Sequence, residues 1–183
     1  MEAGEITLSR ARHSTRYPAR FQLVAAMNPC PCGYLGDAER RCHCTPQQIQ
    51  RYRARISGPL LDRIDLHVAV HRLPAAELLD PRGANEDSAT VRARVCASRA
   101  LQLERQGCAN AQLPADRLPR VCQLAAASKH QLASAARRMT LSGRALHRTL
   151  RVARTIADLA QSPAVASDHL SEALAYRAEE SPP

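Results

Sequence analysis

The chain has 183 residues, of which 45% are hydrophobic and 3% aromatic, and a formal net charge of +9. It has room for one full domain or two small ones, with a core built mostly from aliphatic side chains. No apolar run of about 18 residues or charged-then-apolar leader is present, so we expect a cytoplasmic protein with no membrane partner.

The positive charge is typical of a protein with a polyanionic partner such as nucleic acid. However, 25 of the 26 basic residues are Arg, with Lys129 as the exception, and a codon bias would produce the same excess. The distribution of charge is more informative, because residues 9–55 hold nine Arg against only two acidic residues.

Residues 5–18 are predicted to form a β-hairpin. Residues 5–9 alternate between apolar and polar side chains, and a second extended stretch over 15–17 ends at Pro18. The predicted tip is basic, and its charged or titratable side chains are Arg10, Arg12, His13 and Arg16.

Two apolar runs predict strands of an α/β portion. Residues 21–27 are almost continuously apolar, as in a strand covered on both faces, and the run ends at Asn28-Pro29. Residues 64–70 alternate as a second strand. The residues before position 80 supply too few helices to cover such strands, so we expect this portion to belong to a larger fold.

Four cysteines lie between the two predicted strands as two Cys-x-Cys pairs: Cys30, Cys32, Cys42 and Cys44. Four thiolates satisfy tetrahedral Zn²⁺ and would staple the loop, so zinc is the cofactor that we expect here. The pairs are spaced more tightly than the usual Cys-x-x-Cys, and an iron–sulfur cluster or free thiols stay open as alternatives. A reducing compartment disfavours disulfides.

Helices are predicted for most of the remaining chain. A capping box formed by Thr45 and Gln48 starts one that ends near Ser57. After it, a boundary in the Pro- and Gly-containing stretch 80–87 separates an α/β domain, 1–80, from an all-α domain, 81–183. Capping predicts a long helix in this second domain from Asp87 or Ser88 toward Gly107. Later helices are predicted at about 116–126, 128–139, 142–161 and 168–178, the last two starting at Ser142 and Ser167.

Several strings of residues closely resemble the Mg-chelatase-like AAA+ ATPases of the ComM (YifB) type. They span residues 6–11, 18–21, 23–33, 56–67 and 151–159, and include Met27-Asn28-Pro29-Cys30. The resemblance covers the chain from 2 to 177. It implies the C-terminal part of an AAA+ core, with a β-hairpin, two core strands and helices, followed by a helical lid domain.

The residues that would bind nucleotide phosphates are absent from this sequence. A phosphate loop needs Gly-x-x-x-x-Gly-Lys-Ser/Thr, but Lys129 follows Ser128 and no such string surrounds it. A Walker B Asp-Glu pair is absent as well. We therefore expect ATP and Mg²⁺ to be cofactors of a full-length ATPase, and this chain to be inactive alone.

The resemblance implies catalytic roles for three residues. Asn28 matches the sensor 1 position, Arg63 the arginine finger that reaches a neighbouring subunit, and Arg144 the sensor 2 arginine of the lid. The alternatives are a turn-bonding Asn28 and a surface ion pair at Arg63. Two other features of the Arg144 helix are expected to be structural: a solvated basic face at Arg148 and Arg151, and an ion pair between Arg154 and Asp158.

The predicted hairpin corresponds to one that projects into the central pore of hexameric relatives, where its basic side chains would contact DNA phosphates. The resemblance thus implies a homo-hexameric, ATP-dependent motor of helicase or branch-migration type, acting in DNA recombination and natural transformation. Two alternatives are an Mg-chelatase-like subunit that remodels a partner enzyme, and a non-catalytic module for DNA binding or oligomerisation.

Overall fold

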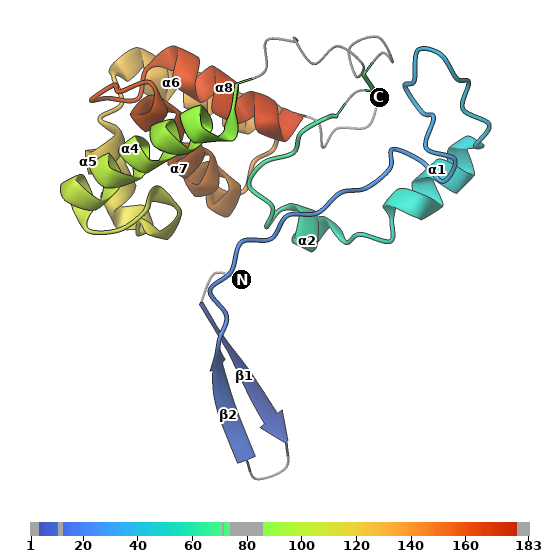
Figure 1. Ribbon diagram of the computed structural model, residues 1–183, viewed down its shortest axis with the longest axis horizontal. Coiled ribbons are helices and arrows are strands. Elements are labelled where there is room, and N and C mark those ends of the chain that lie inside the picture. Colours follow the sequence, from blue (N-terminus) through green and yellow to red (C-terminus); the bar gives the residue numbers. More distant parts are fainter. Residues whose placement is uncertain (1–3, 11–12, 71, 74–85, 179–183) are drawn as a thin grey trace. The chain divides into compact units, whose positions relative to one another are not determined.

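The computed structural model describes residues 4–10, 13–70, 72–73 and 86–178 (Figure 1). The chain divides into two compact units, Met1–Ile64 and Asp65–Pro183, called here the N-terminal and the C-terminal unit. The predicted boundary between domains 1–80 and 81–183 falls largely outside the described residues and stays a prediction.

The N-terminal unit begins with the predicted β-hairpin. Strands β1 (Glu5–Arg10) and β2 (His13–Pro18) pair antiparallel with Ile6 opposite Tyr17. The ladder is exposed on both faces, so pairing within the hairpin and not burial holds it. The predicted basic residue Arg12 is outside the described residues.

Two short helices follow in the same unit. Helix α1 (Pro46–Arg53) starts with the predicted capping box, in which Thr45 Oγ1 accepts from the Gln48 amide at 3.2 Å and the Gln48 side chain accepts from the Thr45 amide at 2.8 Å. The reciprocal bonds satisfy two otherwise orphaned donors. Helix α2 (Gly58–Leu61) is a single turn that begins after Ser57.

The C-terminal unit is helical, as predicted. It contains α4 (Ser88–Gln106), α5 (Leu118–Cys122), α6 (Ala126–Arg138), α7 (Gly143–Leu159) and α8 (Ser167–Ala178), and two 3₁₀ turns (Asn110–Gln112 and Ala115–Arg117). Asp87 caps the start of α4, and Gly107 at φ 75° ends it in the left-handed conformation that glycine adopts without steric cost.

Helix α7 is central to this unit, since it contacts α4, α5 and α8. Its buried face joins a continuous apolar core whose members are Leu113, Leu118, Cys122, Leu132, Leu150, Ala153, Ala157, Val165, Leu170 and Ala173. Most are Leu or Ala, as the shortage of aromatic residues predicted. The unit therefore has an apolar core of its own.

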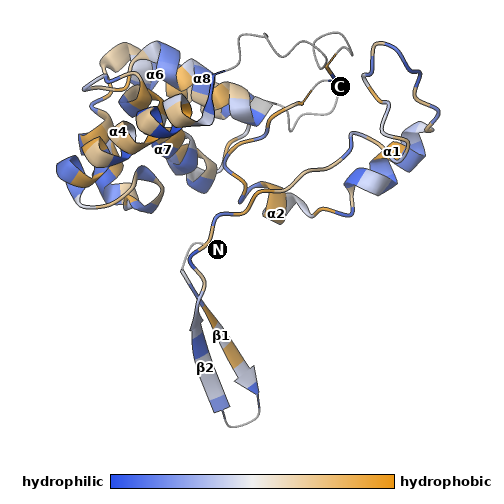
Figure 2. Ribbon diagram, viewed as in Figure 1, coloured by the Kyte–Doolittle hydropathy of each residue, from blue (hydrophilic) through white to orange (hydrophobic). Residues whose placement is uncertain are grey.

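The prediction of two core strands at 21–27 and 64–70 was wrong. Among the described residues β1 and β2 are the only strands, so neither segment has a neighbour with which to exchange backbone hydrogen bonds. Val24 is 83% exposed and Val70 91% exposed, and Figure 2 shows apolar residues along both open segments. In the C-terminal unit the His67 amide donates instead to the Tyr176 carbonyl at 2.9 Å.

Candidate functional site

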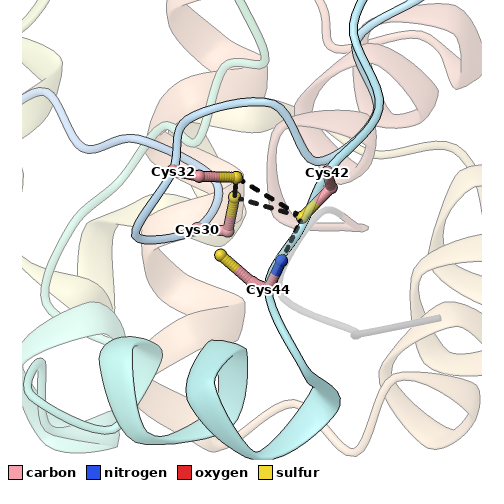
Figure 3. A group of neighbouring side chains, drawn as sticks. All are labelled: Cys30, Cys32, Cys42 and Cys44. Atoms are coloured by element: carbon pink, nitrogen blue, oxygen red, sulfur yellow. Dashed lines mark hydrogen bonds between the residues drawn. The ribbon is translucent and has the colours of Figure 1, made fainter.

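The two Cys-x-Cys pairs converge in the N-terminal unit. All four Sγ atoms lie within 4.8 Å of one another, with Cys30 fully buried and Cys32, Cys42 and Cys44 half-buried. Figure 3 shows the four side chains turned toward a common centre, one Cys-x-Cys pair coming from each end of the loop. The predicted association of the four thiols is confirmed by this geometry.

The sulfur separations suit a tetrahedral metal ion. Cys30 Sγ lies 3.3 Å from Cys32 Sγ and 3.6 Å from Cys42 Sγ, and Cys32 Sγ lies 3.6 Å from Cys42 Sγ. Four sulfurs held at about 2.3 Å from Zn²⁺ at the corners of a tetrahedron are about 3.8 Å apart. A small outward adjustment would therefore bring the sulfurs of Cys30, Cys32 and Cys42 to zinc-ligand spacing, and Cys44 Sγ lies within 4.8 Å of each of them.

The turn after the first pair is built around glycine. The Gly33 amide donates to the Cys30 carbonyl at 3.0 Å, and Gly33 itself has φ +84°. A side chain at this position would strain the backbone, because L-residues rarely adopt a positive φ. Cys30-Pro31-Cys32-Gly33 is therefore a tight turn that presents both sulfurs on one side, which explains how a one-residue spacer can serve a single site.

Backbone amides favour a thiolate in this cluster. Hydrogen bonds from the amides of Tyr34 and His43 lower the pKa of Cys32 to about 6. Burial and the neighbouring thiols raise the pKa of Cys44 to about 12, since charge on one sulfur opposes charge on the next. A divalent cation at the centre would remove this opposition and allow all four thiolates to form.

Polar contacts brace the segment 29–45 along its length; this segment, which carries the four cysteines, is called here the cysteine loop. Asp37 Oδ1 accepts from the amides of Glu39 and Arg40, both at 2.8 Å. The Arg40 guanidinium stacks 5.2 Å from the Tyr34 ring centroid and donates to the Tyr34 hydroxyl at 2.7 Å. In addition, Arg53 Nε of α1 donates to the Pro29 carbonyl at 3.4 Å, so α1 is tied to the residue just before the first cysteine.

Asn28 lies beside this loop. A Cβ added at Gly33 would be 3.8 Å from Asn28 Nδ2, so the carboxamide sits over the glycine turn. The side chain is exposed and makes no hydrogen bond to another described residue, and the alternative of an Asn that bonds its own turn is therefore absent. Its carboxamide is available to a ligand.

The two predicted catalytic arginines lie in different units. Arg63, just after α2, donates from Nη1 to the Pro59 carbonyl at 2.6 Å, which holds the side chain back along its own helix. Arg144 is exposed in the first turn of α7. Thus the structure brings the four cysteines and Asn28 together, but does not join Asn28 to Arg63 by a hydrogen bond.

The expected solvated basic face on α7 was wrong. Arg148 pairs with Asp65 at 2.5 Å, and its side chain is only 11% exposed. Arg151 donates from Nε to the Leu113 carbonyl at 2.9 Å. These partners lie 83 and 38 residues away in the sequence, so helical spacing alone could not reveal them.

The predicted ion pair between Arg154 and Asp158 is confirmed, and sequence reasoning missed the network around it. Arg154 is fully buried and lies 2.9 Å from Asp158. Arg105 of α4 grips the same carboxylate with two bonds, at 2.5 and 2.9 Å, and Asn110 donates to it at 2.7 Å. Such a fully hydrogen-bonded charge is a structural feature that joins α4 to α7.

The hairpin exposes three further predicted site residues, Arg10, His13 and Arg16. Arg10 and His13 face each other across the ladder at the tip. Arg16 lies farther from the tip, 3.7 Å from Glu5, where a 75% exposed side chain makes only a weak, solvent-screened ion pair. Positive charge at the tip is therefore open to solvent.

Two family models match successive parts of the chain. The family model for magnesium chelatase subunit ChlI matches residues 1–78, and the model for the C-terminal region of that subunit matches residues 85–177. The two models together cover both units almost completely.

Curated relatives are similar along the chain. Competence protein ComM of Haemophilus influenzae is 46% identical over 178 residues, and protein YifB of Escherichia coli is 46% identical over 179. An uncharacterized protein of Mycobacterium tuberculosis, Rv2897c, is 40% identical over 181 residues. The matches cover 97% of this chain but 35% of each relative. Within the described part of the chain, no helix combines the length and apolarity that a membrane crossing requires.

Proposed function

Because this chain belongs to the magnesium chelatase subunit ChlI family, in the branch that resembles ComM and YifB, we propose that it is the C-terminal part of an ATP-dependent AAA+ motor acting on DNA. The observation that carries the proposal is 46% identity to a competence protein over 97% of this chain. The chain spans 35% of that relative, and the motor activity belongs to the full-length protein.

In this proposal three side chains complete a nucleotide site whose phosphate-binding part lies elsewhere in the protein. The exposed carboxamide of Asn28 orients the attacking water at the γ-phosphate. Arg63 swings away from the Pro59 carbonyl to stabilise charge on the nucleotide of a neighbouring subunit. Arg144, at the start of α7, contacts the phosphates from the lid. Assembly as a homo-hexamer brings these groups to shared sites.

The hairpin supplies the DNA contact. Exposed Arg10, His13 and Arg16, together with Arg12, contact phosphates without reading sequence. Helicase or branch-migration activity, in recombination and natural transformation, uses such sequence-independent contacts. Binding should consequently weaken strongly as salt concentration rises.

Zinc at Cys30, Cys32, Cys42 and Cys44 has a structural role in this proposal. Four protein ligands fill a tetrahedral site and leave no position for substrate. The cysteine loop then positions the carboxamide of Asn28 relative to α1. It does so through the Gly33 turn beside Asn28 and through the hydrogen bond from Arg53 to the Pro29 carbonyl. Reduced thiolates at this site suit a cytoplasmic protein.

The test uses ATP hydrolysis by the full-length protein with and without forked DNA. An Arg63→Lys variant should lose about 10³-fold in kcat, because the planar guanidinium is replaced by a point charge that cannot span the phosphate oxygens. Arg99→Lys, an exposed change on α4, is the matched control and should leave kcat unchanged.

Retention of wild-type kcat by Arg63→Lys would contradict the arginine-finger role. ATP hydrolysis that forked DNA neither stimulates nor inhibits, together with absence of DNA binding, would contradict the DNA motor and favour a subunit that remodels a partner enzyme. A full-length protein that binds DNA but hydrolyses no ATP would identify a non-catalytic module.

A further inference from the structure

A depression in the N-terminal unit lies between the cysteine loop and α1. Its lining is Pro31, Cys32, His43, Cys44, Gln48, Arg51, Tyr52 and Arg55. We call it the α1 depression. It involves none of the hairpin residues, and neither Asn28, Arg63 nor Arg144 lines it.

The α1 depression is rich in positive charge that nothing in the described chain neutralises. Arg51 lies in the last turn of α1 and Arg55 in the turn that follows the helix; both are exposed, and neither has an ion-pair or hydrogen-bond partner among the described residues. No acidic side chain belongs to the lining. In contrast, Arg53 between them donates to the Pro29 carbonyl and is used to hold the loop. The two outer arginines have no comparable structural task.

The other lining groups extend the same chemistry. The Gln48 carbonyl oxygen accepts from the Thr45 amide, so its NH₂ group is left as a donor directed by the capping box. The half-buried Tyr52 lies between Arg51 and Arg55 in sequence and contributes an aromatic ring to the lining. Cationic donors beside an aromatic surface are the combination with which proteins hold single-stranded nucleic acid, through phosphate contacts and base stacking.

We propose that the α1 depression binds a single strand of nucleic acid, with phosphates at Arg51 and Arg55 and a base stacked on Tyr52. Position supports the assignment, since Arg51 in α1 and Arg55 just past its end both line the depression and can contact neighbouring phosphates of one strand. Cys32 and Cys44 form part of the wall, so the folded cysteine loop shapes the surface. The inference rests on the proposed function for its ligand, but it assigns a second contact separate from the hairpin.

The experiment measures binding of a fluorescein-labelled oligothymidylate of about 20 nucleotides to the 183-residue chain by anisotropy over a range of salt concentrations. Arg51→Gln/Arg55→Gln should weaken binding at least tenfold at low salt. Each lost phosphate contact on a single strand lowers the salt slope by about 0.7, so the slope should fall by about 1.4. Arg51→Lys/Arg55→Lys should retain most of the affinity, because the charge is kept.

Matched controls separate this site from general charge and from the hairpin. Arg92→Gln/Arg99→Gln removes the same charge from exposed positions on α4 and should change affinity less than twofold. Tyr52→Leu should weaken binding about tenfold with the salt slope unchanged, because stacking is lost and the charges stay. Metal content and thermal unfolding of each variant verify that the cysteine loop is folded.

Equal losses in the α1 and α4 double variants, or an unchanged salt slope in Arg51→Gln/Arg55→Gln, would overturn the inference. The inference would also be overturned if polyglutamate at equal charge concentration displaced the oligonucleotide and Tyr52→Leu had no effect on binding. That result would indicate an acidic protein segment as the ligand. These outcomes leave DNA-stimulated hydrolysis by the full-length protein untouched, so the two proposals fail independently.

Discussion

Different forces stabilise the two units of this chain. The C-terminal unit buries a continuous set of Leu, Val, Ala and Cys side chains around α7. Among the described residues of the N-terminal unit, Cys30 is the only buried hydrophobic one, while Phe21 and Val24 are 62% and 83% exposed. Apolar packing therefore stabilises one unit, and the other depends on local hydrogen bonds and on its cysteine cluster.

The comparison teaches that apolar content does not by itself make a core. Residues 21–27 are as apolar as a buried strand, yet they stay exposed because no described segment covers them. Helix α7 has fewer consecutive apolar residues, but their helical spacing places them on one face against α4, α5 and α8. The following substitutions should therefore affect the two units very differently.

The largest expected effect is on the N-terminal unit. Removal by a chelator of the zinc that we propose at the cysteine cluster, or Cys30→Ser/Cys32→Ser, should remove a source of free energy that amounts to about 10 kcal/mol or more in small zinc modules. We expect amides of residues 28–56 to lose protection from hydrogen exchange, while α4 to α8 keep theirs. Exchange measured by mass spectrometry, with elemental analysis of zinc, provides the readout.

Exposed Cys96 on α4 supplies the control for thiol loss, and Cys96→Ser should leave both zinc content and exchange unchanged. If amides 28–56 stayed protected after complete metal removal, the cysteine cluster would have no structural role. Loss of protection throughout the C-terminal unit would show that the two units are not independently stabilised.

The next largest effect is expected when the hydrogen-bond network around Asp158 in the C-terminal unit is broken. Asp158→Asn leaves Arg154 buried with no compensating charge, which costs about 3–5 kcal/mol in the free energy of unfolding. Exposed Asp168 on α8 is the control, and Asp168→Asn should cost less than about 1 kcal/mol. Denaturant unfolding followed by helical circular dichroism measures both, and equal costs would contradict the importance of the network.

The carboxylate of Asp158 also makes the stability of the fold depend on pH in the acid range. Burial raises the pKa of Asp158, but hydrogen bonds from Arg105 and Asn110 and the charge of Arg154 more than offset this, and the net pKa is lowered. The ionised group therefore stabilises the fold above the pKa of an unfolded Asp, about 4, and this stabilisation is lost as the pH falls toward the lower folded pKa. The thermal stability of wild type should fall across this window more than that of Asp158→Asn.

The smallest effect compares apolar truncations in the two units. Leu118→Ala removes a fully buried side chain from the core around α7 and should cost about 2–5 kcal/mol. Val24→Ala, in the exposed segment of the N-terminal unit, should change stability by less than about 0.5 kcal/mol. A large destabilisation by Val24→Ala would show that residues 21–27 pack in solution, and would remove the contrast between the units.

Local signals were the part of the sequence that predicted this structure well. The capping box at Thr45, the cap at Ser142 and the left-handed Gly107 all act within four residues, so their effects can be read without tertiary information. The hairpin and the clustering of the four cysteines likewise follow from alternation and close spacing. The predicted strands at 21–27 and 64–70 failed because a strand needs a partner that composition cannot supply.

The amino-acid sequence by itself determined the helices, the hairpin, the four-cysteine cluster and membership of the family, because each rests on neighbouring residues or on matched strings. Only the tertiary structure decided the rest. It paired Arg105 with Asp158 across 53 residues and gave Arg148 and Arg151 partners. It left Arg51 and Arg55, beside the cysteine loop, without a partner among the residues that the structure describes. Partners so distant in the chain are chosen by packing, which no local pattern records.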